Sequence, residues 1–155
     1  MTNRSKNIGT FTESAVVKIC KMYGFPDAHR NSLHGAVDVG DIWIHPHVVI
    51  EVKGGDAART ASDGQLDVWM AQTLLERDNH GADIGILVTA RKGVGPASAD
   101  RWNAHLTIEE LHLLTSTTGY IPGAVANFRV RLSLGDVLTL LHSGGYGPGL
   151  ENQND

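Results

Sequence analysis

Two segments of the chain repeat apolar residues at the spacing of an amphipathic helix. The first runs from Phe11 to Tyr23 and stops before Gly24, and its apolar face carries Val16, Val17, Cys20 and Tyr23. The second runs from Gln65 to Arg77, and its apolar face carries Leu66, Trp69, Met70, Thr73 and Leu74. Because residues 54–64 are small, polar and rich in glycine, we expect a loop before the second helix.

Other segments have the β-branched or alternating patterns of strands. Two apolar runs within residues 41–53 are separated by His45-Pro46-His47, which predicts a β-hairpin. The continuous apolar run at 82–89 predicts a strand buried on both faces. Residues 102–107 and 127–134 predict two more strands, the second at a sheet edge, and short helices are expected at 107–114 and 136–141. This order predicts an α/β domain at 1–142, and the polar, glycine-rich residues 143–155 are expected to form a loose tail.

Composition narrows the class of protein. The 155 residues are enough for one domain that needs no disulfide or metal to hold its core, and the single cysteine, Cys20, fits a reducing cytoplasm. The polar first ten residues predict no signal peptide, and no apolar run is long enough for a membrane span. The net charge of −4 argues against coating of nucleic acid by bulk charge, but leaves open an enzyme that binds DNA through a local patch and metal ions.

The hairpin places candidate chemistry on one face. If Ile44 lies opposite Val48, then Asp41 lies opposite Glu51, and Lys53 projects on the same face as Glu51. The other face would be apolar, with Ile42, Ile44, Val48, Ile50 and Val52. Two adjacent carboxylates favour a hard cation such as Mg²⁺ or Mn²⁺, and a nearby lysine can position a water for attack on a phosphodiester. A slip of one residue would turn Asp41 to the wrong face, so the register decides this prediction.

These residues resemble a known family. Asp41, followed ten positions later by Glu51-Val52-Lys53, resembles the core of the PD-(D/E)xK nucleases. Segments further toward the N-terminus are similar to the pattern of archaeal and phage-type Holliday junction resolvases of this superfamily: Gly9-Thr10-Phe11-Thr12-Glu13, Gly24-Phe25, Arg30-Asn31-Ser32 and Gly35. The segment Gln65-Leu66-Asp67-Val68-Trp69 resembles the glutamine helix motif of RecB-like members, with tryptophan in place of the usual tyrosine. The resemblance covers about residues 9–89.

The resemblance implies a restriction-endonuclease-like fold, a mixed β-sheet flanked by helices, and a Mg²⁺-dependent DNA endonuclease that cuts four-way junctions. It also implies the bacterial or phage-infected cytoplasm as the setting. Junction resolution needs two symmetric cuts and therefore predicts a homodimer. The implied metal ligands are Asp41, Glu51, the backbone carbonyl of Val52, and Glu13. Lys53 and Gln65 are the implied residues that position the attacking water.

Several alternatives stay open. Asp38 competes with Asp41 as the first acid, although a turn-forming aspartate before Gly40 is the simpler interpretation. Glu13 also fits a solvent-facing position on its helix, and Gln65 also fits a capping box with Ser62. An exonuclease or nicking enzyme acting on linear DNA would share the same acids and lysine. A noncatalytic DNA-binding module is the alternative of another class.

Basic and polar residues bordering the hairpin are the candidates for DNA contact. They fall in the N-terminal segment and in loops, and together would form a positive rim around the acidic site: Arg4, Lys6, Arg30, Ser32, Arg59, Arg91 and Lys92. The eight histidines do not predict zinc, because the chain has neither cysteine pairs nor an H-E-x-x-H helix.

Overall fold

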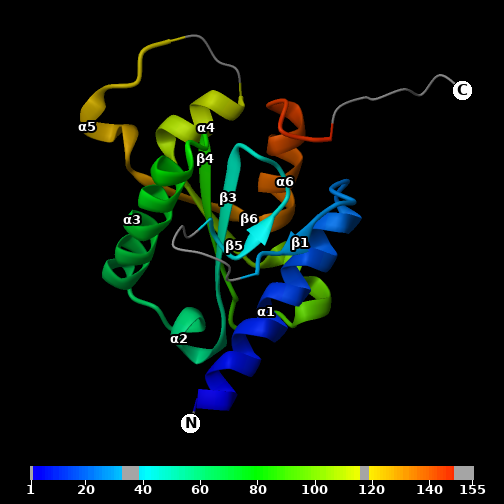
Figure 1. Cartoon of the computed structure of the whole chain (residues 1–155). Helices are drawn as coiled ribbons and strands as arrows, with labels where there is room; N and C mark the ends of the chain where they lie inside the picture. The colour runs from blue at the N-terminus through cyan, green and yellow to red at the C-terminus, as the bar shows by residue number, and fades with distance from the viewer. Residues whose placement is uncertain (1, 33–38, 116–118, 149–155) are drawn as a thin grey trace, which may run out of the picture.

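A computed structural model describes residues 2–32, 39–115 and 119–148 of the chain (Figure 1). In chain order its elements are α1 (Thr2–Met22), β1 (His29–Arg30), β2 (Ile42–Trp43), β3 (Val48–Lys53), α2 (Gly55–Arg59), α3 (Asp63–His80), β4 (Ile84–Thr89), the 3₁₀-helix η1 (Pro96–Arg101), β5 (Asn103–Thr107), α4 (Ile108–Leu114), α5 (Gly123–Ala126), β6 (Arg129–Ser133) and α6 (Leu134–Ser143). The strands form a six-stranded sheet in the order β1-β2-β3-β4-β5-β6.

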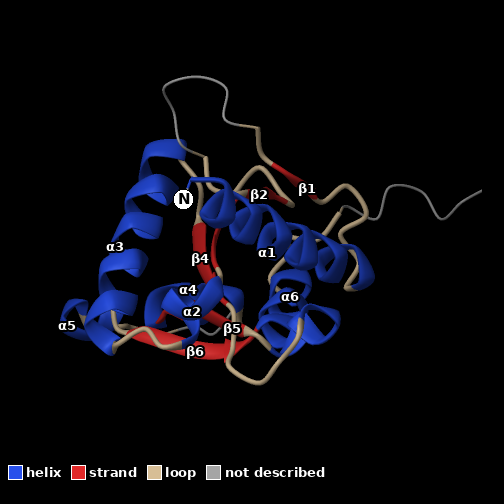
Figure 2. Cartoon of the chain, turned by 90° about the horizontal axis from the view of Figure 1, so that it is seen from below, coloured by secondary structure: helices blue, strands red, loops and turns tan. Residues whose placement is uncertain are grey.

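The sheet is mixed, as predicted. Strands β3 and β4 are parallel, whereas the other neighbouring pairs are antiparallel. A parallel pair needs a long crossover, and α3 supplies it between β3 and β4. Figure 2 shows α3 on one side of the sheet and α1 with α6 on the other. The chain is therefore a single α/β domain with helices on both faces of the sheet.

The main core lies under α1 and α6. Alternate residues of the central strands, such as Ile50 and Ile86, point to this face and are fully buried against Val16 of α1 and Leu138 of α6. On the opposite face α3 packs so close to β4 that a Cβ at Gly85 would lie only 3.3 Å from the Thr73 carbonyl oxygen. Every residue of β4 is buried, which confirms the strand predicted from its continuous apolar run.

The hairpin is confirmed in the predicted register. Ile42 pairs with Ile50, which is the alignment that places Asp41 across from Glu51. The strands expected at 102–107 and 127–134 are β5 and β6, and β6 lies at the sheet edge as predicted. The short helices expected at 107–114 and 136–141 are α4 and α6.

Helices extend further than the apolar pattern predicts. Helix α1 begins at Thr2 rather than Phe11, and Ile8 in its added part lies close to α2, where a Cβ at Gly55 would be 3.2 Å from the Ile8 side chain. The prediction of a loop at 54–64 is wrong in part, since α2 forms within this segment and buries Ala58. The flanking glycines favoured a loop, but burial of one alanine face stabilises a short helix there.

The beginning of the expected tail is packed on the domain. Helix α6 continues to Ser143, and Tyr146 donates a hydrogen bond to Asp83 at 3.0 Å and packs edge-on against His45. Residues 149–155 lie outside the described part of the chain. Among the described residues, no helix combines the length and the apolar character needed to cross a bilayer.

Candidate active site

The hairpin of β2 and β3 brings Asp41 and Glu51 together within the sheet. The backbone N–H of Asp41 donates to the Ile50 carbonyl at 2.8 Å, so the backbone before β2 remains attached to β3. The Asp41 Oδ2 atom accepts a hydrogen bond from the Val52 N–H, also at 2.8 Å. This bond draws the Asp41 carboxylate over β3, where it interacts directly with the Glu51 side chain. The predicted pair of carboxylates is therefore present.

The backbone around Asp41 is shaped by a glycine and an asparagine. Gly40 adopts φ +83°, and a Cβ there would lie 2.8 Å from the Ile50 carbonyl oxygen, so only glycine fits without a shift. The Asn31 side-chain amide donates to the Gly40 carbonyl at 3.2 Å, and the Asn31 N–H donates to the Asp41 carbonyl at 2.9 Å. The segment that presents Asp41 is thus held from β3 on one side and from the end of β1 on the other.

Glu51 is a buried acid with an abnormal pKa. Its side chain is only 8% exposed, and burial raises its pKa. The negative charges of Asp41 and Glu76 and a hydrogen bond to Asp41 raise it further, whereas Lys53 lowers it, and the net result is a pKa of about 9. Burial and the neighbouring acids therefore favour the protonated form of the Glu51 carboxyl at neutral pH in the unliganded protein.

The carboxylate pair fits a divalent cation. The Glu51 Oε2 atom is buried and has no hydrogen-bond partner among the described residues, which leaves it available as a ligand. A cation beside it would favour the ionised form of Glu51, which burial and the charges of Asp41 and Glu76 otherwise disfavour. Within the described ranges, however, no three His, Cys, Asp or Glu side chains gather closely enough to hold a metal ion. Two carboxylates and a backbone carbonyl are consequently the protein ligands on offer, and waters would complete the shell of Mg²⁺.

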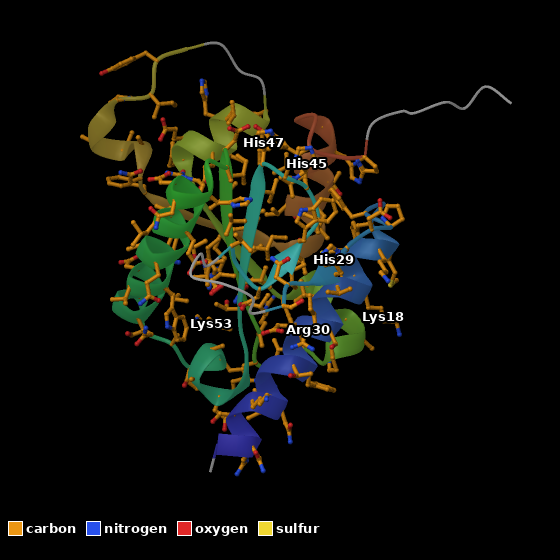
Figure 3. All side chains as sticks on the ribbon, viewed as in Figure 1. Lys18, His29, Arg30, His45, His47 and Lys53 are labelled. Carbon is orange, nitrogen blue, oxygen red and sulfur yellow. The ribbon has the colours of Figure 1, made fainter. Side chains whose placement is uncertain are left out.

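Lys53 stands at the end of β3 beside this pair. It is half-buried, and its Nζ atom lies 5.8 Å from the centre of the Trp69 ring on α3, which is within the range of a cation–π contact. Its positive charge acts on Glu51, because it lowers the pKa of that carboxyl. In Figure 3, Lys53 lies in the lower part of the fold, while His45 and His47 lie at the other end of the hairpin.

A buried polar network lies next to Lys53 in the sheet. Thr89 is the register partner of Lys53, and its hydroxyl lies 3.1 Å from His105 Nε2. The Nδ1 atom of His105 accepts from Arg129, because a guanidinium only donates, so Nε2 donates to Thr89. Burial and two arginines lower the pKa of His105 to about 4, and the ring is neutral. Arg129 also donates to Asp67 at 3.0 Å, which ties the start of α3 to the sheet.

Glu13 and Arg30, predicted for different purposes, bind each other. Arg30 Nε lies 2.6 Å from a carboxylate oxygen of Glu13, and Arg30 also donates to the Thr10 hydroxyl at 3.3 Å. The structure therefore does not bring Glu13 to Asp41 and Glu51, and Arg30 joins α1 to β1. The pair stabilises this junction modestly, since the Arg30 side chain is 42% exposed.

Gln65 lies at the exposed start of α3. Its backbone N–H donates to the Ser62 hydroxyl at 3.1 Å, which is the N-cap of the helix, and no described contact joins its side chain to the acids. Helix α3 reaches the site through Trp69 instead. Asp38, the alternative first acid, lies outside the described residues.

The predicted DNA-contact residues are dispersed, and Arg30 is the one paired with Glu13. Arg59, Arg91 and Lys92 line one cavity, and Arg4 and Arg59 line a second. Lys6 and Ser32 are exposed, on α1 and after β1 respectively. Sequence reasoning did not select Arg101 and Arg131, which line the first cavity together with Arg59, Arg91 and Lys92.

Glu76 and Asn31 also lie near the site and are not singled out by the sequence patterns. Glu76 follows Trp69 and Thr73 at helical spacing on the face of α3 that meets the sheet, so an acid within an apolar stripe was a usable indication. Asn31 belongs to the segment Arg30-Asn31-Ser32, but its support of Asp41 depends on the pairing of β1 with β2.

Comparisons with protein-family models, with curated proteins and with solved structures find no match for this chain.

Proposed function

We propose that this protein is a Mg²⁺-dependent DNA endonuclease with a restriction-endonuclease-like fold, and that four-way DNA junctions are its substrate. The observation that carries the proposal is the Glu51 carboxyl, buried against Asp41 with one oxygen unpartnered in the described structure. A fold gains no stability from two acids packed in this way, so their placement beside a lysine supports a site for a cation.

The arrangement of elements supports the proposed fold. Helix α1, the antiparallel strands β1 to β3, the crossover helix α3 and the parallel strand β4 follow one another in a mixed sheet with helices on both faces. The acids and Lys53 lie on the hairpin at its centre, where the resemblance to PD-(D/E)xK nucleases expects them.

The residues have distinct parts in the proposed hydrolysis. Asp41 and Glu51, with the Val52 carbonyl, would hold the cation. When bound, Mg²⁺ would lower the pKa of a water and offset the charge that develops on the phosphoryl oxygens. Lys53, restrained by its contact with Trp69, would orient the attacking water toward phosphorus. The reaction adds this water across one P–O ester bond and leaves a phosphate and a hydroxyl end.

The preference for junctions rests on the resemblance, and it implies a homodimer with two coordinated sites. Helices α4 and α6 differ as candidates for the dimer contact. Helix α6 is directed into the core, with Leu134, Val137, Leu138 and Leu141 buried. Helix α4 leaves Leu113 49% exposed and remains the better candidate.

Cleavage of matched DNA substrates tests the proposal. Wild type is expected to make paired, symmetric nicks in a four-way junction when Mg²⁺ is present and none in EDTA. Glu51→Gln should lower the rate at least about 100-fold, because the cation loses a ligand. Asp27→Asn, which changes an exposed acid between α1 and β1, is the matched control and should cut like wild type.

The other outcomes separate the alternatives. Faster cutting of linear duplex than of the junction would indicate an exonuclease or nicking enzyme. DNA binding without cleavage of any substrate would indicate a noncatalytic binding module and would contradict the proposal.

A further inference from the structure

A basic cavity of about 430 Å³ lies at the end of the sheet that contains the last residue of β4. Five cationic side chains line it and no acid does: Arg59 from α2, Arg91 and Lys92 after β4, Arg101 from η1 and Arg131 from β6. This concentration of positive charge contrasts with a net charge of −4 for the whole chain.

The cations are available for a ligand. Only Arg59 forms an ion pair with a described acid, a 3.4 Å contact with Asp56, whose side chain is 95% exposed. A contact of this kind with a solvated partner is weak and is readily exchanged. The cavity is also lined by Asn103 and Ser133, whose side chains can hydrogen-bond to an anion. Convergent arginines with neutral polar groups are suited to a phosphate group.

The sheet register relates this cavity to the candidate active site. Lys53 pairs with Thr89, and Thr89 pairs with Asn103, which lines the cavity. Paired residues in neighbouring strands point to the same face of a sheet, so Lys53 and Asn103 lie in one row across it. Two strand spacings separate them by about 10 Å. Because a DNA strand winds around the axis as it rises about 3.4 Å per phosphate, a separation of this size spans roughly one to two phosphates along one strand.

We propose that this cavity binds a phosphate of the DNA strand a few nucleotides from the bond that is cut. The inference rests on the proposed nuclease function for the identity of the strand, whereas the cavity and its charge stand independently of catalysis. The phosphate could be an internal phosphodiester or the monoester at a 5′ end. Both present the same oxygens, and the monoester carries more negative charge.

The test measures binding of fluorescent DNA in EDTA, where no cleavage occurs, by the double variant Arg101→Gln/Arg131→Gln. Both residues are exposed, so the fold is expected to persist, and a thermal melt checks this. The affinity should fall at least about tenfold, because a charge-assisted contact to phosphate is worth a factor of that order. The slope of log affinity against log salt should become shallower by about one to two.

The matched control is Lys18→Gln/Lys21→Gln, which removes the same charge from the exposed face of α1; Figure 3 shows Lys18 on the side of the fold away from Lys53. Duplexes with and without a 5′ phosphate distinguish the two sources. Loss of a preference for the phosphorylated end in the double variant identifies a terminal phosphate, and equal loss for both duplexes identifies an internal one.

An affinity and salt slope equal to those of the control would overturn the inference. Failure of the nuclease function would be visible separately. If wild type binds through the cavity in EDTA but never cuts DNA with Mg²⁺, the phosphate site stands and the catalytic proposal fails.

Discussion

Replacing Lys53 with methionine is expected to lower the rate of junction cleavage by about 10²- to 10⁴-fold, the usual contribution of a side chain that positions or deprotonates a nucleophile. Methionine keeps an unbranched stem that packs against Trp69 but removes the charge beside Glu51. Single-turnover cleavage with saturating Mg²⁺ and enzyme measures this effect without a contribution from product release.

Binding measurements show whether the loss is catalytic. The affinity of the Lys53→Met protein for uncut junction in EDTA should remain within about threefold of wild type, since one contact at most is removed. Lys18→Met, at an exposed position on α1, is the control and should cut at the wild-type rate. If the Lys53 variant cuts within a factor of ten of wild type, Lys53 does not act on the water.

Glu51→Gln is expected to stabilise the metal-free protein at pH 8. The folded-state pKa of Glu51 is about 9, above its ordinary value of 4.5, mainly because of burial. Between these values the unfolded chain releases the proton while the folded chain retains it. The free energy of unfolding of the wild type therefore falls as pH rises from about 4.5 toward 9. Glutamine does not titrate and removes this dependence.

Thermal unfolding in EDTA from pH 5 to pH 9 measures the difference. At pH 8 the variant should melt at least about 2–4 °C above wild type, equivalent to about 1 kcal/mol for a domain of this size. Toward pH 5 the two curves should converge, because the pH then approaches the ordinary Glu51 value of 4.5, where the wild type has lost little stability. Asp27→Asn, at an exposed position between α1 and β1, should follow the wild-type curve. Parallel wild-type and Glu51→Gln curves over the whole range would show that Glu51 is ionised in the folded protein.

The hairpin and its acids could be predicted because local rules determine them. The turn at His45-Pro46-His47 fixes which residues of two short strands face each other, and the alternation of side chains then places Asp41 with Glu51. The apolar partners on the other face, such as Ile42 and Ile50, make any other register costly, since a slip would bury polar groups in the main core.

Interactions between distant elements could not be predicted in the same way. The resemblance assigns Glu13 to the metal site, and its position makes Arg30 a candidate for DNA contact. Their pairing with each other depends on how α1 packs beside β1. The basic cavity is similar, because Arg101 and Arg131 come from η1 and β6, which meet only once the last third of the chain folds onto the sheet. Local patterns indicate which residues are unusual, whereas tertiary packing decides which of them meet.

The most direct test of the account is the binding of a divalent cation to Asp41 and Glu51. Calorimetric titration of Mn²⁺ or Mg²⁺ at pH 7.5, in two buffers of different ionisation enthalpy, gives the affinity and the number of protons released. Wild type should bind the cation and release about one proton, because Glu51 must ionise to become a ligand. Asp41→Asn and Glu51→Gln should each lose the binding and the proton release. Wild-type affinity in both variants would contradict the account.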